Sequence, residues 1–221
     1  MTRVAGASGR LVGEKEDAMV TLELPDRTTL NSFIADRRAK GLDGPDEVWE
    51  GTYIVMPNPG NEHQAITTQL AHVFKCLVDD SGLGHTLDGC NVSDREEDWT
   101  ENYRCPDSAV FLKGNHAKDR KSHWLGGPDL AVEVISRGDR ARQKLEFYAA
   151  AGVRELVVID RDPWRIELYR PTEDTAGPVA VTLPGGDPVE TTTVPMKWSL
   201  GVANGDRPAV RLEAGEKVWT A

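Results

Sequence analysis

An acidic residue lies in the middle of an apolar stretch of the sequence. Residues 126–136 read GGPDLAVEVIS, and Leu130 to Ile135 have the apolar, partly β-branched character of a strand buried on both faces, except at Glu133. Burying an unpaired carboxylate costs several kcal/mol. We therefore expect Glu133 to be protonated, to be paired with a cation such as an arginine, or to bind a metal ion.

Two Pro-Asp pairs offer a second carboxylate, and each opens an expected strand. Asp129 lies four residues before Glu133, about 13 Å away at ~3.3 Å per residue, so the two cannot easily share a small ion. Asp107 lies on another strand, and neighbouring strands are only ~4.8 Å apart. With a suitable register Asp107 and Glu133 can converge on Mg²⁺, which takes few carboxylate oxygens and keeps waters for substrate phosphates. Alternatively, Asp107 only binds the local backbone at the start of its strand.

A lysine and a tyrosine are spaced to join this pair of acids. Lys144 begins the stretch KLEFY, so Lys144 and Tyr148 share one face of an expected helix. Both can then point toward the sheet edge where Glu133 emerges. A lysine there can orient an attacking water or stabilise charge on a scissile phosphate. Without that context, a helix lysine is a solvated surface residue.

The elements that must position these residues follow from apolar periodicity and from turn residues. Residues 1–24 are small, polar and charged, which indicates a flexible arm. The remaining patterns predict a short helix from Thr28 or Thr29 to Gly41, a hairpin in EVWEGTYIVM with its turn at Glu50 and Gly51, a helix from Glu62 to about Val78 capped by Asn61, a weak strand in HTLDGCNV, a loop in SDREEDWTENYR, strands over 105–112 and 129–136, a helix ending at Gly152, and strands in ELVVID and WRIELY.

A helix between two apolar strands is typical of a mixed sheet with helices on its faces. We predict an α/β fold with the core order helix-strand-strand-strand-helix-strand. An N-terminal helix and hairpin precede this core, and residues 171–221, rich in Gly, Pro and Thr, add irregular β structure. The expected organisation is an arm over 1–24, a main domain over 25–170, and a C-terminal β extension over 171–221 packed on that domain.

Charge and composition restrict the partners. The 221 residues carry a net charge of -10, which argues against coating nucleic acid through bulk electrostatics. Residues 113–144 nevertheless carry eight basic residues against four acidic ones, so a local basic surface can form there. No stretch approaches the roughly 18 apolar residues of a membrane span, and the N-terminus lacks the apolar core of a signal peptide. We expect a cytoplasmic protein whose three cysteines are free thiols.

The order of these motifs resembles a known group of nucleases. A strand with Pro-Asp, a strand with an acid and a nearby lysine are similar to the PD-(D/E)XK superfamily, the restriction-endonuclease-like fold. More closely, the run from EVWEGTYIVMPNPGNEHQAI through RCPDSAVFL, GGPDLAVEVIS, KLEFYAAAGVRELVVID and RIELYR resembles the Uma-two-type restriction endonucleases. The resemblance covers residues 24–170.

The resemblance implies roles for individual residues. Asp107 would be the first metal-binding aspartate and Glu133 the acid of the motif, with the Val134 carbonyl as a further ligand of Mg²⁺ or Mn²⁺. Ile135 stands where the motif lysine is expected, so Lys144 would take over that role from the following helix. Accessory residues would be Glu62, His63 and Tyr148. Arg137, Arg140 and Arg142, in the basic segment, would contact nucleic acid.

Three functions remain open from the sequence. The first is a metal-dependent endonuclease that hydrolyses DNA, double-stranded and cut by a homodimer by analogy with restriction enzymes. The second is a catalytically degenerate binding or assembly module in which Glu133 pairs with an arginine such as Arg142. The third is structural zinc, since one set of residues offers nitrogen and sulfur ligands: His72, Cys76, His85, Cys90 and Cys105.

Overall fold

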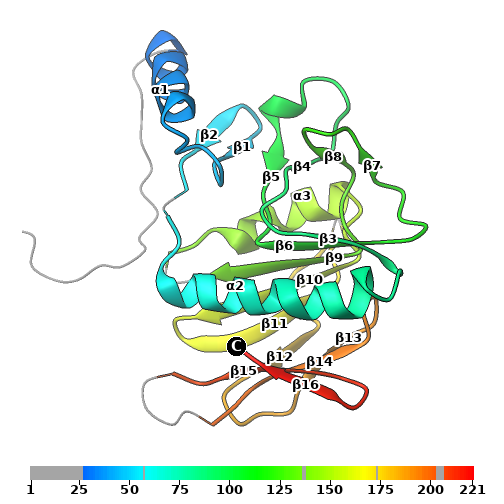
Figure 1. Ribbon diagram of the computed structural model, residues 1–221. Helices are drawn as coiled ribbons and strands as arrows, with labels where there is room; N and C mark the ends of the chain where they lie inside the picture. Colours follow the sequence, from blue (N-terminus) through cyan, green and yellow to red (C-terminus); the bar gives the residue numbers. More distant parts are fainter. Residues whose placement is uncertain (1–26, 57, 136–137, 173, 203–206) are drawn as a thin grey trace, which may run out of the picture.

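A six-stranded mixed sheet forms the centre of the molecule. The computed structural model describes residues 27–56, 58–135, 138–172, 174–202 and 207–221; the predicted arm over 1–24 lies outside them. In sheet order the strands are β12 (Ala180–Thr182), β11 (Trp164–Tyr169), β10 (Glu155–Arg161), β9 (Leu130–Ile135), β6 (Ser108–Leu112) and β3 (Gly84–Leu87) (Figure 1). Within this sheet β9 and β10 run parallel, and the other neighbouring strands are antiparallel.

Helix α2 (Asn61–Phe74) covers one face of this sheet and continues through a π-helical turn, η1 (Lys75–Asp79). Its buried residues Ile66, Leu70 and Phe74 join Val132 of β9 in one core. The prediction of this helix is confirmed in extent, but its N-cap is Gly60 rather than Asn61. The apolar residues of α2 recur at helical spacing because this side of the helix packs on the sheet.

The C-terminal residues complete the same core. Four antiparallel strands form a separate sheet, and Trp198 at its centre lies 6.1 Å from Phe74 of α2, measured between ring centroids. These strands are β13 (Val189–Thr191), β14 (Met196–Leu200), β15 (Val210–Ala214) and β16 (Lys217–Thr220). The C-terminal segment is therefore more regular than its Gly- and Pro-rich sequence predicts, and its strand β12 belongs to the central sheet.

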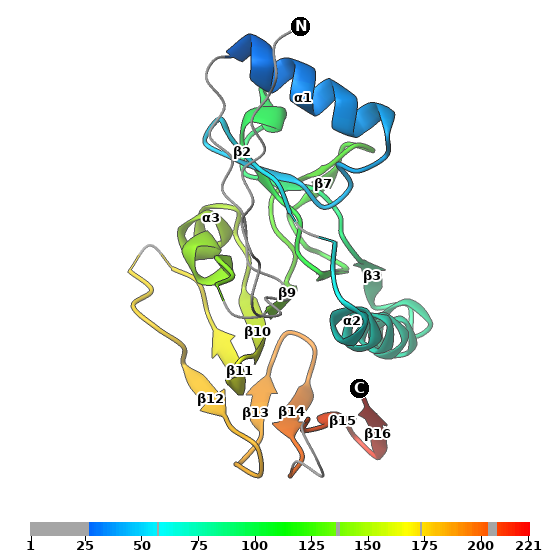
Figure 2. The same cartoon turned by 90° about the vertical axis from the view of Figure 1, so that its left-hand side faces the viewer.

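The opposite face of the central sheet is covered by a 3-10 turn, η3 (Ala141–Lys144), and the short helix α3 (Leu145–Ala150). Seen end-on, α2 and α3 lie on opposite sides of β9 (Figure 2). Ala131 and Ile135 pack with Phe147 and Tyr148 on the α3 side. Glu133 lies two residues from both Ala131 and Ile135, and every second side chain of a strand points to the same face, so Glu133 also points toward α3.

A second, smaller sheet lies above α3, at the top of Figure 1. Its strands, in sheet order, are β2 (Thr52–Ile54), β1 (Glu47–Trp49), β5 (Tyr103–Arg104), β4 (Val92–Ser93), β8 (Trp124–Leu125) and β7 (Lys118–Asp119). The hairpin of β1 and β2 turns at Glu50 and Gly51, as the sequence predicts, and both residues have positive φ.

Two predictions about the segment before β6 are wrong. The expected single strand in HTLDGCNV is two strands, β3 and β4, which belong to different sheets. The expected loop in SDREEDWTENYR contains the 3-10 turn η2 (Trp99–Glu101) and β5. Local propensity could not show these features because each of these short strands depends on pairing with a distant partner.

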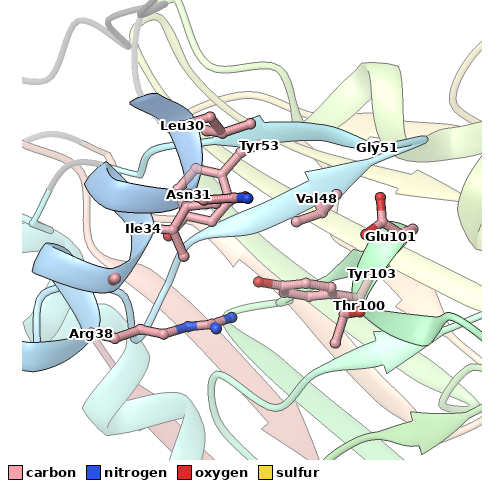
Figure 3. Close-up of a pocket in the computed structure, with 11 residues that line it drawn as sticks. Leu30, Asn31, Ile34, Arg38, Val48, Gly51, Tyr53, Thr100, Glu101 and Tyr103 are labelled. Carbon is pink, nitrogen blue, oxygen red and sulfur yellow. The ribbon is translucent and has the colours of Figure 1, made fainter. Parts of the chain in front are cut away.

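Helix α1 (Arg27–Ala39) is attached to the small sheet at one end. Arg37 donates two hydrogen bonds to the buried carboxylate of Asp46, at 2.6 and 2.8 Å. Nearer the N-terminus of α1, Leu30 and Ile34 face the small sheet across a cavity of about 760 Å³, and Val48 lies in the far wall of this cavity (Figure 3). Within the described ranges, no helix is both long enough and apolar enough to cross a membrane.

Candidate functional site

Asp107 lies directly before β6, beside Glu133 on the neighbouring strand β9. The antiparallel ladder of these two strands ends at the pair of Ser108 and Val132, so Asp107 and Glu133 are the next residues beyond that pair. The charge of Asp107 acts on Glu133 and adds to the rise of its pKa. Asp107 Oδ2 also accepts a hydrogen bond from the Val134 backbone N–H at 2.7 Å. The two acids predicted to converge are thus neighbours at the end of the ladder.

Lys144 and Tyr148 both reach Glu133. The Lys144 ammonium donates to Glu133 Oε1 at 2.9 Å, and the Tyr148 hydroxyl donates to the same oxygen at 2.5 Å. Only 1% of Lys144 and 4% of Glu133 is exposed, so this contact lies inside the protein. Lys144 ends the 3-10 turn and Tyr148 lies on α3, yet both point to one acid as their predicted spacing requires. The hypothesis that Arg142 pairs with Glu133 is wrong, since Lys144 is the partner.

Glu47 completes the cluster and was missed by the sequence reasoning. It lies on β1 of the small sheet, is fully buried, and accepts a hydrogen bond from Lys144 Nζ at 2.8 Å. The Cys105 backbone N–H and the Trp49 indole N–H also donate to its carboxylate, at 2.9 and 2.6 Å. The signal was present, because Glu47 is an acid beside the β-prone residues Val48 and Trp49, just as Glu133 is an acid within an apolar strand.

Two buried carboxylates share one ammonium here, and this arrangement shifts the pKa values of Glu133 and Lys144. Burial raises the pKa of Glu133 to about 8, although Lys144 opposes the shift, while the charges of Asp107 and Glu47 add to it. Burial would lower the pKa of Lys144, but the charges of Glu133 and Glu47 outweigh it and hold that pKa above its usual range. Lys144 therefore stays protonated and supplies the positive charge at the centre of the cluster.

His63 lies against Asp107, whereas Glu62 points elsewhere. His63, in the first turn of α2, places Nε2 3.1 Å from Asp107 Oδ1. Glu62 instead pairs with Arg161 at 3.0 Å and with Arg207 at 3.5 Å. Of the two accessory residues predicted at the start of this helix, the structure brings only His63 to the acids.

The arginines expected to contact nucleic acid occupy different environments. Arg142 is held by two carboxylates, Asp160 at 2.6 Å and Glu167 at 2.8 Å, both buried on the α3 side. Arg140 is partly exposed just before the η3 turn, and Arg137 lies outside the described residues. The ion pairs of Arg142 fix the turn that carries Lys144, and a role in contacting nucleic acid stays a prediction for all three residues.

The donor set around Asp107 and Glu133 fits a hard divalent cation held by few protein oxygens. From the described part of the chain, no hydrogen bond reaches Glu133 Oε2, and the Asp107 side chain is 24% exposed. No group of three or more His, Cys, Asp or Glu side chains in the described ranges is arranged to hold a metal ion. Two carboxylates suit an ion that keeps several waters, as Mg²⁺ does.

Structural zinc finds no such support. His72 and Cys76 contact each other at 3.9 Å across one helical turn. Cys105 Sγ, in contrast, donates to the Gly89 carbonyl, and all three cysteines are free thiols. The expected zinc ligands therefore do not gather at one point among the described residues.

The fold of this chain is similar to that of a protein of known structure. A crystal structure of "a putative nuclease belonging to DUF820" from Anabaena variabilis is 19% identical, covers 67% of this chain and 83% of its own, and superposes with a TM-score of 0.54. At that identity the likeness concerns the fold alone.

The sequence match identifies the family. Residues 43–203 match the model of the Uma2 family, described as "putative restriction endonuclease", and the chain belongs to this family. No curated protein matches the chain. The resemblance drawn from the sequence motifs is confirmed, as is the mixed sheet flanked by helices.

Proposed function

We propose that this protein is a Mg²⁺-dependent endonuclease, also active with Mn²⁺, that hydrolyses phosphodiester bonds of double-stranded DNA as a homodimer. Asp107, Glu133 and the Val134 carbonyl would hold the ion. The observation that carries the proposal is the position of Asp107 beside Glu133, where the ladder of β6 and β9 ends, with Lys144 bound to the same glutamate. Family membership supports the nuclease class, and the hard oxygen donors support the choice of ion.

Each side chain of the cluster has a task in this proposal. A bound divalent cation would offset the negative charge of the scissile phosphate and favour ionisation of the attacking water. Lys144 carries a positive charge fixed beside Glu133, where it stabilises charge that develops on the phosphate. Tyr148 orients Glu133, and His63 orients Asp107. Water attacks phosphorus and the 3′ oxygen leaves, so the product carries a 5′-phosphate.

Glutamine at position 133 tests the assignment. Glu133→Gln keeps the shape of the side chain and removes its charge, so plasmid cleavage with Mg²⁺ or Mn²⁺ should disappear. Glu146→Gln is the matched control, because Glu146 is exposed on α3, the helix that also carries Tyr148. This variant should cleave like the wild type. Cleavage that survives Glu133→Gln would refute the proposed site.

A binding or assembly module is the second candidate, and specific observations favour it. Ile135 replaces the motif lysine, and Lys144 is bound on both sides by buried acids, which is also what a purely structural ion pair would look like. Titration with Mn²⁺ separates the two candidates, because a degenerate site should show no saturable binding. Sedimentation of the protein with and without DNA tests the homodimer.

A further inference from the structure

Lys144 is shared between an acid of the proposed metal site and an acid outside it. Its ammonium is 2.9 Å from Glu133 Oε1 and 2.8 Å from Glu47 Oε1. Glu133 lies beside Asp107 at the end of the ladder, whereas Glu47 comes from the small sheet and is held by the Cys105 and Trp49 N–H groups. The two acids therefore differ in role although they bind the same ammonium.

The strand that carries Glu47 is fastened to the helix that carries Tyr148. The Arg104 guanidinium lies 4.6 Å from the ring centroid of Trp49 on β1 and 4.3 Å from that of Phe147 on α3. Arg104 also donates to the Val48 carbonyl at 2.9 Å. The hairpin and α3 are thus clamped together by one buried cation, which fixes the distance from Glu47 to Lys144.

We propose that Glu47 is a positioning residue that holds Lys144 in the site and competes with Glu133 for its ammonium. Lys144 is then the internal counter-ion of Glu133, and a divalent cation that binds Glu133 takes over this role. The inference rests on the proposed function. Without metal, Glu133 and Glu47 share the ammonium between them. With a divalent cation on Asp107 and Glu133, Glu47 retains Lys144 and its charge within the site.

Charge balance makes this competition measurable. Removing the charge of Glu47 leaves Lys144 with Glu133 as its one ion-pair partner among the described residues, which strengthens the pair that a divalent cation must displace. Removing the charge of Lys144 has the opposite effect, because the acids lose their internal cation. Since charges a few Å apart in a buried site interact strongly, each change should alter divalent-ion affinity by about tenfold or more.

The experiment measures Mn²⁺ binding to the full chain without DNA, by calorimetry and by the EPR signal of free Mn²⁺. We expect Glu47→Gln to weaken binding and Lys144→Gln to tighten it. Glu47→Asp keeps the charge and should restore affinity toward the wild-type value. In the double variant Glu47→Gln with Lys144→Gln, the loss caused by Glu47→Gln should largely vanish, because Glu47 acts through Lys144. Glu146→Gln again serves as the exposed control.

The outcomes separate this inference from the proposed function. If the wild type binds Mn²⁺ and folded Glu47→Gln binds it equally well, the positioning role is wrong while the metal site stands. An equal loss with and without Lys144 would also overturn the inference. If the wild type binds no Mn²⁺, both proposals fall. If Glu47→Gln does not fold, the Mn²⁺ affinity of Lys144→Gln tests the inference instead. An affinity equal to or lower than that of the wild type would then show that Lys144 does not compete with the metal ion.

Discussion

Replacing Glu133 by glutamine should make the metal-free protein more stable. Glu133 is a carboxylate buried in the central sheet, and burial raises its pKa from 4.5 to about 8, while the charge of Lys144 opposes that shift. An acid whose pKa is higher in the folded state loses stability as the pH rises from its unfolded to its folded pKa. Glutamine does not titrate, and Lys144 keeps Glu47 as its ionic partner.

The size of the effect follows from the two pKa values. Below pH 4.5 Glu133 is protonated in both states, and wild type and variant should be similar. At neutral pH the folded state must keep a proton that the unfolded chain releases, which costs about 3 kcal/mol. Above the folded pKa the cost levels off at about 5 kcal/mol. The gap between variant and wild type should therefore widen as the pH rises to about 8.

Chemical denaturation in EDTA, at pH values from about 5 to about 8, measures this gap. Glu155→Gln is the matched control, because Glu155 is also buried, at the start of the neighbouring strand β10. Burial would raise the pKa of Glu155, but hydrogen bonds from Thr193 and Thr192 outweigh it and lower the pKa. A lowered pKa stabilises the fold above the unfolded pKa of the acid, so Glu155→Gln should destabilise the protein over this range.

The two substitutions are thus expected to act with opposite sign. The reasoning about Glu133 is refuted if its glutamine variant is less stable than the wild type near pH 8, or if the difference does not change with pH.

Three further predictions concern the same elements. Tyr148→Phe removes a donor from Glu133 and should lower the free energy of unfolding by about 1–3 kcal/mol in denaturant titration, and an unchanged midpoint would contradict this. Asp46→Asn leaves Arg37 without its buried partner, costs about 3 kcal/mol, and should speed tryptic cleavage at the end of α1; equal cleavage rates would argue against the anchor. Mn²⁺ should raise the melting temperature of the wild type but not of Glu133→Gln, and equal shifts would place the ion elsewhere.

The sequence predicted those parts of the site that depend on local pattern. Glu133 is recognisable as an acid within an apolar strand, and the i, i+4 spacing of Lys144 and Tyr148 correctly places both on the side of that acid. The meeting of Asp107 and Glu133 needed a strand register, which local pattern alone does not specify. Only the pairing of β6 with β9 supplies it.

The remaining features depend on contacts between distant segments. Glu47 reaches Lys144 across 97 positions of the chain, and a three-residue strand gives little periodicity to recognise. Trp198 and Phe74 meet in the same way, through packing of a late sheet on an early helix. Long-range pairing of this kind overrides weak local propensity, which is why the short strands were misassigned.

Strand β1 has two sides that serve different neighbours. Glu47 faces the lysine in the interior, while Val48, the next residue, forms part of the wall of the cavity beneath α1. Side chains of adjacent strand residues point to opposite faces. One three-residue strand therefore separates the cavity beneath α1 from the buried contacts of Lys144, so a change at either side meets the other across a single layer of backbone.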